Sequence, residues 1–491
     1  MEFRNNIINT ALLGTEKKQL SAAELPPSIQ PQIEQILQES TDNETKFLKG
    51  ATLVLNFCRA GVMPLKVALQ PDESPREVLT YCSRDAIRVL RDTLSYKFNT
   101  LTWYWCKLCN EKNLIVQPHL LPELFEWGVA TRKQHAGLFR QVIGERGVWF
   151  SRFSEEWAFV NAAGELTDWD TATLKQRVSY LEQLRNDRPA MAVEKIQAAW
   201  KEENAASRVE LIGPLAINIS LDDEAFLMEI LSDKSQKVKE KALQLLKLIP
   251  GSELMRVYEQ ILRDSTQLVQ GKMLGLIGQS ISIKLKLSDS EQIRKTGIQV
   301  LSSDKSISDD NFILMQLMAE VPPSFWEKHL QCDAAQAVKI FASKNELKKF
   351  QLHLCKSVIK FNDKTWAGEI MEQFSTAPVQ LLWVLDDEAR IRHAEKFLKE
   401  SVSEVVLSLR SGAIVDWPLK FTKSLLTLLA DNPTAFNKNF YESISLYMPQ
   451  SLIKELDSLT PSDELKKLYW PKLAQEIREL VEMKERVKRV F

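Results

Sequence analysis

The sequence is poor in the residues that make turns. Glycine (16) and proline (19) are scarce among its 491 residues; together they form about 7% of the chain, against an average near 12%. A sheet-rich fold needs a turn about every eight to twelve residues, so this scarcity argues against an all-β fold. Hydrophobic residues (44%) and charged residues (26%) are at ordinary globular levels, which argues against a disordered chain.

The chain also lacks an excess of charge of either sign. Lys and Arg number 64, and Asp and Glu number 65, which gives a formal net charge of −1. Nucleic-acid-binding proteins usually carry a basic domain or stripe, because phosphate neutralisation supplies most of the affinity. Nucleic acid is therefore an unlikely partner. We expect no membrane span either, since the longest apolar stretch, 50–67, contains Arg59 and Lys66.

Cysteine is too sparse for a disulfide framework in a chain of this length. The six cysteines are Cys58, Cys82, Cys106, Cys109, Cys332 and Cys355. They are typical of reduced thiols in a cytosolic protein. Residues 1–6 do not show the charged-then-apolar pattern of a signal peptide. We therefore expect a cytoplasmic location.

One Cys-x-x-Cys pair, Cys106 and Cys109, raises the question of a metal or redox site. Structural zinc needs four ligands, and the nearest histidines, His119 and His135, are not spaced as in a standard zinc finger. A thioredoxin-like pair needs a preceding strand, and the residues before Cys106 favour a helix. Buried thiols are the favoured interpretation, with metal and redox roles as the alternatives.

No pattern of catalytic residues is present. The sequence contains no G-x-S-x-G, phosphate-binding loop, dinucleotide fingerprint or H-E-x-x-H. Three adjacent acidic pairs, at 222–223, 309–310 and 386–387, are typical of helix starts, where the helix dipole favours negative charge. We assign no catalytic residue, cofactor or metal ligand.

The main pattern in the sequence is apolar residues spaced at the period of an α-helix. Between 237 and 249 the apolar residues fall on one helical face; they are Val238, Ala242, Leu245, Leu246 and Ile249. Ser252 then follows a Pro-Gly turn and is a good N-cap for the next helix. Further upstream, Ser220 and Asp223 have the spacing of a capping box.

The pattern recurs 31 residues later: Leu231, Asp233 and the face ending at Leu246 align with Leu262, Asp264 and a face ending at Ile277. Periods of 20 to 50 residues are typical of helical repeats. The spacing resembles HEAT-like repeats, in which an aspartate opens the second helix. We predict an all-α fold, an α-solenoid of HEAT-like helical hairpins with an irregular Trp-rich helical N-terminal domain.

Composition suggests three parts. Six of the twelve tryptophans lie between Trp103 and Trp169, which marks residues 1–168 as the Trp-rich helical N-terminal domain. Residues 169–300 carry the HEAT-like repeats, and 301–491 form a helical C-terminal region. We expect its last helix to begin at Pro471, because proline is favoured in the first turn.

A lysine-rich stretch lies in the C-terminal region. Seven lysines fall between Lys339 and Lys364, against two acidic residues, Glu346 and Asp363. Specific phosphate and base contacts favour arginine over lysine. A solvated face is the favoured interpretation, with an acidic protein partner or nucleic acid as the alternatives.

A second segment is the best candidate for a specific interaction site. Glu145 and Arg146 lie in a glycine-rich turn close to Trp149 and Trp157. Arg and Trp are enriched at interface hot spots. The structural alternative is a buried Arg–Glu pair that holds the turn against a tryptophan core.

Several segments together resemble a bacterial protein family known only as a domain of unknown function. They are Asn9–Thr15, Gly144–Trp149 with Glu156 and Trp157, the stretch 177–208, and Leu248–Ser252. The resemblance implies a helical-repeat protein without an assigned activity. Its members are encoded near MoxR-type AAA+ ATPases, von Willebrand A-type proteins and SWIM zinc-finger proteins. That neighbourhood implies a part in a chaperone-like or metal-insertion assembly.

We therefore expect a non-enzymatic helical-repeat scaffold or adaptor for protein–protein interaction, in an assembly associated with an AAA+ ATPase. Its expected partner is a protein such as a MoxR-type AAA+ ATPase or a von Willebrand A-type protein. Helical-repeat proteins present extended surfaces suited to this. The alternatives are a nucleic-acid-binding helical repeat and an enzyme without a recognisable motif.

Overall fold

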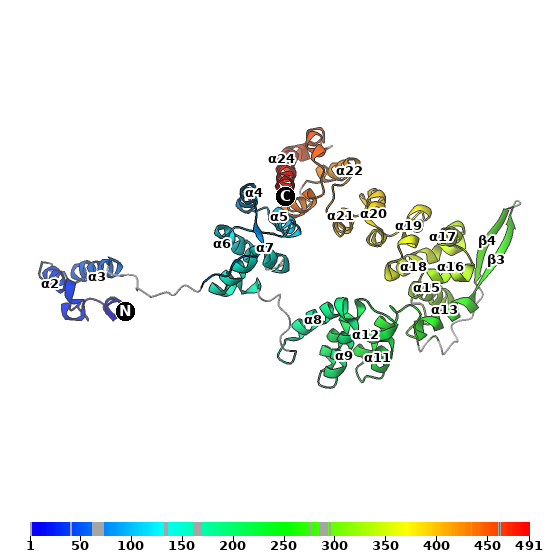
Figure 1. Ribbon diagram of the computed structural model, residues 1–491, viewed down its shortest axis with the longest axis horizontal. Helices are drawn as coiled ribbons and strands as arrows, with labels where there is room; N and C mark the ends of the chain where they lie inside the picture. The colour runs from blue at the N-terminus through cyan, green and yellow to red at the C-terminus, as the bar shows by residue number, and fades with distance from the viewer. Residues whose placement is uncertain are drawn as a thin grey trace. The chain divides into compact units, whose positions relative to one another are not determined.

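The computed structural model describes residues 2–39, 42–60, 73–131, 136–160, 169–273, 276–283, 293, 296–433, 435–459, 461 and 463–491 (Figure 1). Most of these residues are helical, so the predicted all-α class is confirmed. The chain divides into two compact units, Met1–Ser74 and Pro75–Phe491. The boundary after Ser74 is additional to those that composition suggested.

The first unit is a small helical body with its own core. It consists of α1 (Glu2–Leu13), the 3-10 turns Ala22–Glu24 and Pro27–Ile29, α2 (Gln30–Glu39) and α3 (Asn43–Ala60). Ile33 and Val54 are fully buried at its centre, between α2 and α3. Gly50 packs so closely against Leu20 that an added Cβ would lie 2.7 Å from its Cδ2.

The second unit begins with the Trp-rich helices. Its first elements are β1 (Thr80–Tyr81), α4 (Arg84–Ser95), α5 (Asn99–Glu111), β2 (Leu114–Ile115), a 3-10 turn (Pro118–Leu120), α6 (Leu121–Ala130), α7 (Ala136–Phe150), and two 3-10 segments (Ser151–Phe153 and Glu155–Val160). The short strands β1 and β2 pair in parallel. Trp105 is fully buried, and its indole Nε1 donates to the carbonyl of Ala86, which fixes α5 against α4.

The next helices form a separate hydrophobic core. They are α8 (Leu174–Asp187), α9 (Pro189–Ala199), α10 (Ala205–Ile212), the 3-10 turns Gly213–Ala216 and Leu221–Asp223, α11 (Glu224–Ile230) and α12 (Gln236–Leu246). The apolar face predicted for 237–249 is confirmed, since all five of its side chains are buried. The capping box of Ser220 and Asp223 and the N-cap Ser252 are confirmed as well.

Two arginines tie these helices together through carboxylates. Arg185 in α8 is 1% exposed and forms a bidentate pair with Asp223, with N–O distances of 2.8 and 2.9 Å. Its remaining donors reach backbone carbonyls, among them that of Ile217. Arg208 in α10 pairs with Asp233 just before α12. Asp233 also accepts from the backbone N–H of Ser235, but Ser235 is the N-cap of α12, so the prediction that the aspartate caps this helix is wrong.

The second copy of the repeat motif is not a helical pair, which corrects the prediction. Its aspartate, Asp264, lies inside α13 (Glu253–Ser265), and the following residues form an antiparallel hairpin of β3 (Thr266–Met273) and β4 (Leu276–Ile283). Gly271 and Gly278 pair across it. Each glycine disfavours a helix by about 1 kcal/mol, and the many β-branched residues favour strands, so these preferences outweigh the helical spacing.

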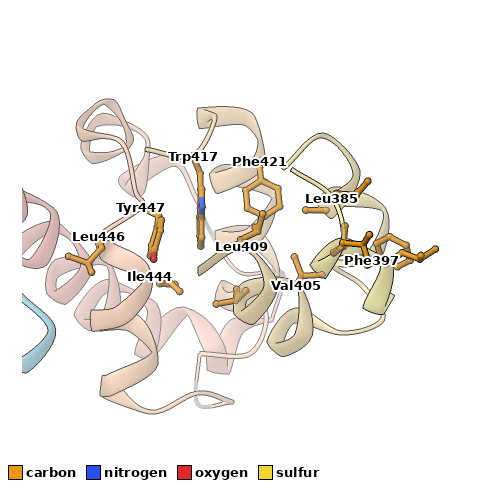
Figure 2. Packing of buried hydrophobic residues seen from close by; sticks show 14 of the residues in the cluster. Leu385, Phe397, Val405, Leu409, Trp417, Phe421, Ile444, Leu446 and Tyr447 are labelled. Atoms are coloured by element: carbon orange, nitrogen blue, oxygen red, sulfur yellow. The ribbon is translucent and has the colours of Figure 1, made fainter. Parts of the chain in front are cut away.

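The remaining helices form one core that also includes the Trp-rich helices. They are α15 (Asp309–Glu320), α16 (Ser324–Leu330), α17 (Ala334–Ser343), α18 (Asn345–Phe361), α19 (Lys364–Gln373), α20 (Asp387–Ala394), α21 (Val402–Arg410), α22 (Leu419–Ala430), α23 (Lys438–Ser445) and α24 (Glu464–Arg489), with 3-10 segments Val379–Trp383, Glu395–Phe397, Gln450–Lys454 and Leu456–Ser458. The three acidic pairs all lie at helix starts, as predicted. Figure 2 shows Trp417 stacked on Tyr447, with ring centroids 5.0 Å apart.

The last helix, α24, packs against the first helices of the second unit. It starts at Glu464 and contains Pro471, so the predicted start at Pro471 is wrong. Helix α24 packs against α4 and α5 (Figure 1). Phe491 meets Trp105 edge to face at 5.2 Å, and Arg486 forms an ion pair with Asp92. Among the described helices, none has the length and apolar character needed to cross a membrane.

We predict that Leu245→Ala lowers the free energy of unfolding by about 2–5 kcal/mol, because it removes a buried leucine and leaves a cavity. Leu245 is 2% exposed, whereas Leu352, at 53%, is the matched control. Leu352→Ala should stay within about 0.5 kcal/mol of the parent. Urea unfolding followed by circular dichroism measures both. Equal losses in the two variants would contradict the assigned core.

Candidate functional site

The predicted interaction site begins at a sharp turn inside α7. Gly144 has φ +66° and ψ −174°, so the helix kinks there. Beyond the kink, the Glu77 carboxylate accepts from the backbone N–H of Glu145 at 3.0 Å and of Arg146 at 2.8 Å. The Arg146 guanidinium donates to the carbonyl of Pro75. The turn thus anchors the first residues of the second unit.

The four predicted residues do not converge on one point. Glu145 is exposed and the Arg146 guanidinium donates to the Pro75 carbonyl, so the two side chains are not the buried Arg–Glu pair of the structural alternative. Trp157 stacks on the buried Phe125 at 4.9 Å. Trp149 is half-buried and meets Phe153, which is 65% exposed, at 4.9 Å. The surface part of this site is therefore Glu145, Trp149 and Phe153.

The Cys106–Cys109 pair lies in the core with a third cysteine. The sulfurs of Cys82 and Cys109 lie 3.3 Å apart, and Cys109 donates to the Leu114 carbonyl. Burial raises the pKa of Cys106, while the contact with Cys82 and burial raise the pKa of Cys109. A raised pKa makes Cys106 and Cys109 weak nucleophiles. His119 is exposed, and His135 lies outside the described residues.

The lysine-rich stretch is only partly one surface. Lys348, Lys349 and Lys356 are exposed on α18. Lys360 turns inward and forms an ion pair with Glu320, which also pairs with Lys247. Burial lowers the pKa of Lys360. The exposed part is a lysine face of α18 without arginine.

The described residues also form a cleft that sequence analysis did not predict. It has a volume of about 790 Å³ and lies between α5–α6 and α23. Its lining residues are Asn99, Thr100, Trp103, Trp127, Ala130, Thr131, Arg410, Asn437, Asn439, Phe440, Glu442, Ser443, Leu446 and Tyr447. We call it the α5–α23 cleft. Ligand pockets commonly measure roughly 300–1,000 Å³, so it is of functional size.

Glu442 forms the floor of the cleft and joins its two walls. The carboxylate of Glu442, on α23, is 2% exposed and accepts from the backbone N–H of Thr100 at 2.5 Å. Thr100 is in the first turn of α5, where an anion is favoured by the helix dipole. Burial raises the pKa of Glu442 above its usual value, while the backbone amides of Thr100 and Leu101 oppose this.

The cleft was missed because its walls are far apart in the sequence. The only local signals were Asn437, which is the N-cap of α23, and the dense tryptophans around Trp103. Neither pattern indicates that residues 99–131 and 410–447 meet. That pairing depends on long-range packing of α5 against α23 and α24.

The fold and site define an all-α protein with a cleft lined by aromatic, amide and charged side chains. A family model matches residues 6–491, and the chain belongs to this family, a family of unknown function (DUF5691). No curated protein and no solved structure matches the chain.

We predict that Gly144→Ala destabilises the protein by about 1–3 kcal/mol, because an L-residue is strained at this backbone conformation. An added Cβ would also lie 2.6 Å from a Glu77 carboxylate oxygen. Gly368→Ala in α19 is the control, since a Cβ there meets nothing within 4 Å. It should be neutral or stabilising by up to about 1 kcal/mol, as expected inside a helix. Similar thermal shifts for the two variants would contradict a constrained turn.

We predict that Glu442→Ala lowers the free energy of unfolding by about 1–3 kcal/mol, because it leaves the Thr100 amide without its partner. The pKa of Glu442 is higher in the folded state than in the unfolded state. Glu442 therefore contributes most to the free energy of unfolding at acid pH, and this contribution falls as the pH rises through the folded-state pKa. The deficit of the variant should therefore shrink as the pH rises from about 4 to 7. Chemical unfolding across this range measures it, and a growing deficit would contradict the assignment.

Proposed function

We propose that the protein is a non-enzymatic helical-repeat scaffold that holds a protein partner at the α5–α23 cleft. The observation that carries this proposal is the cleft itself. Its buried floor, which includes Glu442 and Leu446, is built from one end of the second unit, and its α5 wall from the other. Trp103 and Trp127 line it, and tryptophan is favoured at interface hot spots.

The HEAT-like arrangement belongs to the same proposal. Helices α8 and α9 contact each other, as do α11 and α12, and a buried ion pair between Arg185 and Asp223 and a partly buried one between Arg208 and Asp233 join this group of helices. Breaking a buried pair of this kind typically costs about 3–5 kcal/mol, so such contacts support a rigid frame. A rigid frame suits a scaffold, because it presents its binding surface without a large ordering cost.

The proposed setting is an assembly that contains a MoxR-type AAA+ ATPase or a von Willebrand A-type protein. The resemblance described above supports it. The expected partner surface is the α5–α23 cleft, with Glu145, Trp149 and Phe153 as a second, smaller candidate surface. The role of these three residues in binding stays a prediction.

Site-specific photo-crosslinking in the native host tests this function. A photo-reactive residue at Asn439, on the exposed rim of the cleft, is compared with one at Leu352 on α18. We predict that mass spectrometry finds one protein enriched at Asn439 and absent at Leu352, and that it is the ATPase or the von Willebrand A-type protein. Identical adduct profiles at the two positions would contradict a partner site at the cleft.

The exposed lysines of α18 favour one alternative, a nucleic-acid-binding helical repeat. Surface lysines without arginine suit a hydrated face better than specific phosphate recognition. We therefore predict a dissociation constant for duplex DNA weaker than about 1 μM at physiological salt. A gel-shift titration measures it. A salt-dependent nanomolar value, lost on Lys348→Glu with Lys356→Glu, would favour the alternative over the scaffold.

A further inference from the structure

Two asparagine side chains in the lining of the α5–α23 cleft leave donors open to a ligand. The side-chain oxygen of Asn99 already accepts from the indole of Trp127 at 3.1 Å. The side-chain oxygen of Asn437 accepts from the backbone N–H of Phe440 at 3.0 Å. Each asparagine therefore has its amide NH₂ group, with two donors, to offer a ligand.

The charged lining residue that is exposed in the cleft also favours a ligand with acceptor groups. Arg410, at the end of α21, is exposed at the rim and carries the five donors of a guanidinium. Glu442 is the only carboxylate among the lining residues, and it is buried against the backbone of Thr100. Arg410 is thus the cationic side chain of the lining, and no lining residue presents an exposed carboxylate.

The rest of the lining is aromatic. Trp103 and Trp127 come from the α5–α6 wall, and Phe440 and Tyr447 come from the opposite wall. The Tyr447 ring is held in place by its stacking on Trp417 (Figure 2) and by donation from its hydroxyl to the Arg410 carbonyl at 3.2 Å. Trp127 and Tyr447 are buried, so the aromatic surface open to a ligand comes from the half-buried Trp103 and Phe440. Aromatic surface beside donors suits a ligand that alternates apolar and acceptor groups.

We propose that the α5–α23 cleft binds an extended acidic peptide segment. A carboxylate side chain of the segment is held by Arg410 and by the amides of Asn99 and Asn437, and a neighbouring apolar side chain packs between the half-buried rings of Trp103 and Phe440. This inference rests on the proposed scaffold function and names the chemistry of its partner. A single arginine fits a planar carboxylate bidentately, whereas phosphopeptide recognition generally uses a cluster of arginines.

Fluorescence anisotropy on the full chain tests this proposal. The probe is a fluorescein-labelled peptide that alternates Asp and Phe, and its Asn-for-Asp version is the matched peptide. We expect the acidic peptide to bind at least about tenfold more tightly than the Asn version, because hydrogen bonds to charged groups contribute about 1.5–3 kcal/mol. Equal affinities, or no binding of either peptide, would overturn the proposal.

Two arginine variants locate the interaction. Arg410→Gln should weaken binding of the acidic peptide about tenfold or more and should remove the preference for Asp over Asn. Arg392→Gln is the control, since Arg392 is also an exposed arginine, 61% exposed, but lies on α20 outside the cleft lining. It should leave the affinity unchanged. Equal losses in both variants would show attraction to surface charge in general and would overturn the assigned site.

Further arms separate this inference from its alternatives. Displacement of the peptide by inorganic phosphate at matched ionic strength would indicate a general anion site and overturn the peptide assignment; persistence of binding supports it. A protein crosslinked at Asn439 together with failure of the acidic peptide would leave the scaffold function standing and overturn this chemistry. Peptide binding sensitive to Arg410→Gln, without any crosslinked protein, would support the chemistry and count against the scaffold function.

Discussion

The contact between α5 and the last two helices is the constraint on which the second unit depends. Residues from 92 to 105 meet residues from 442 to 491 through three different interactions. Glu442 accepts the Thr100 amide, Arg486 pairs with Asp92, and Phe491 packs against Trp105. Because one core contains both the Trp-rich helices and α13–α24, neither end is a free terminal cap. The α5–α23 cleft exists only where these two ends meet.

Charged groups are also buried where α24 packs against the rest of the second unit. Lys484 of α24 is fully buried and pairs with Asp416 at 2.8 Å. Its ammonium group also donates to the Met448 carbonyl. A buried ion pair is weak evidence for added stability, because desolvation offsets most of the attraction. Removing one partner is costly, however, so these groups specify which helices meet.

Local structure could be predicted from the sequence where one physical rule decides it. The apolar face of α12, the N-cap Ser252 and the capping box of Ser220 and Asp223 follow from side-chain spacing and from unpaired amides at helix starts. The same rules gave a wrong prediction at 262–283. There the apolar spacing matched the repeat and predicted a helix, but the glycines and β-branched residues between those positions favour the observed hairpin. Pro471 misled for a related reason, since tertiary packing tolerates it inside α24.

The candidate site was harder to predict, because its residues acquire their chemistry from distant neighbours. Glu145 and Arg146 were chosen by type, yet Glu77, more than sixty residues earlier, fixes their backbone. The donors of the cleft depend on contacts between distant residues. The indole of Trp127 donates to the side-chain oxygen of Asn99, and the Tyr447 hydroxyl donates to the Arg410 carbonyl. A single sequence does not show which distant residues come into contact. The apolar periodicity of a helix, in contrast, is a local pattern that the sequence does show.

Hydrogen exchange on the full chain, with and without Phe491→Ala, measures the closure most directly. If the ends of the second unit support each other, the substitution should speed exchange in α4, α5 and α24 together, and α8–α12 should keep their protection because they have a separate core. Faster exchange confined to the end of α24, with α5 unchanged, would contradict the closure and the cleft that depends on it.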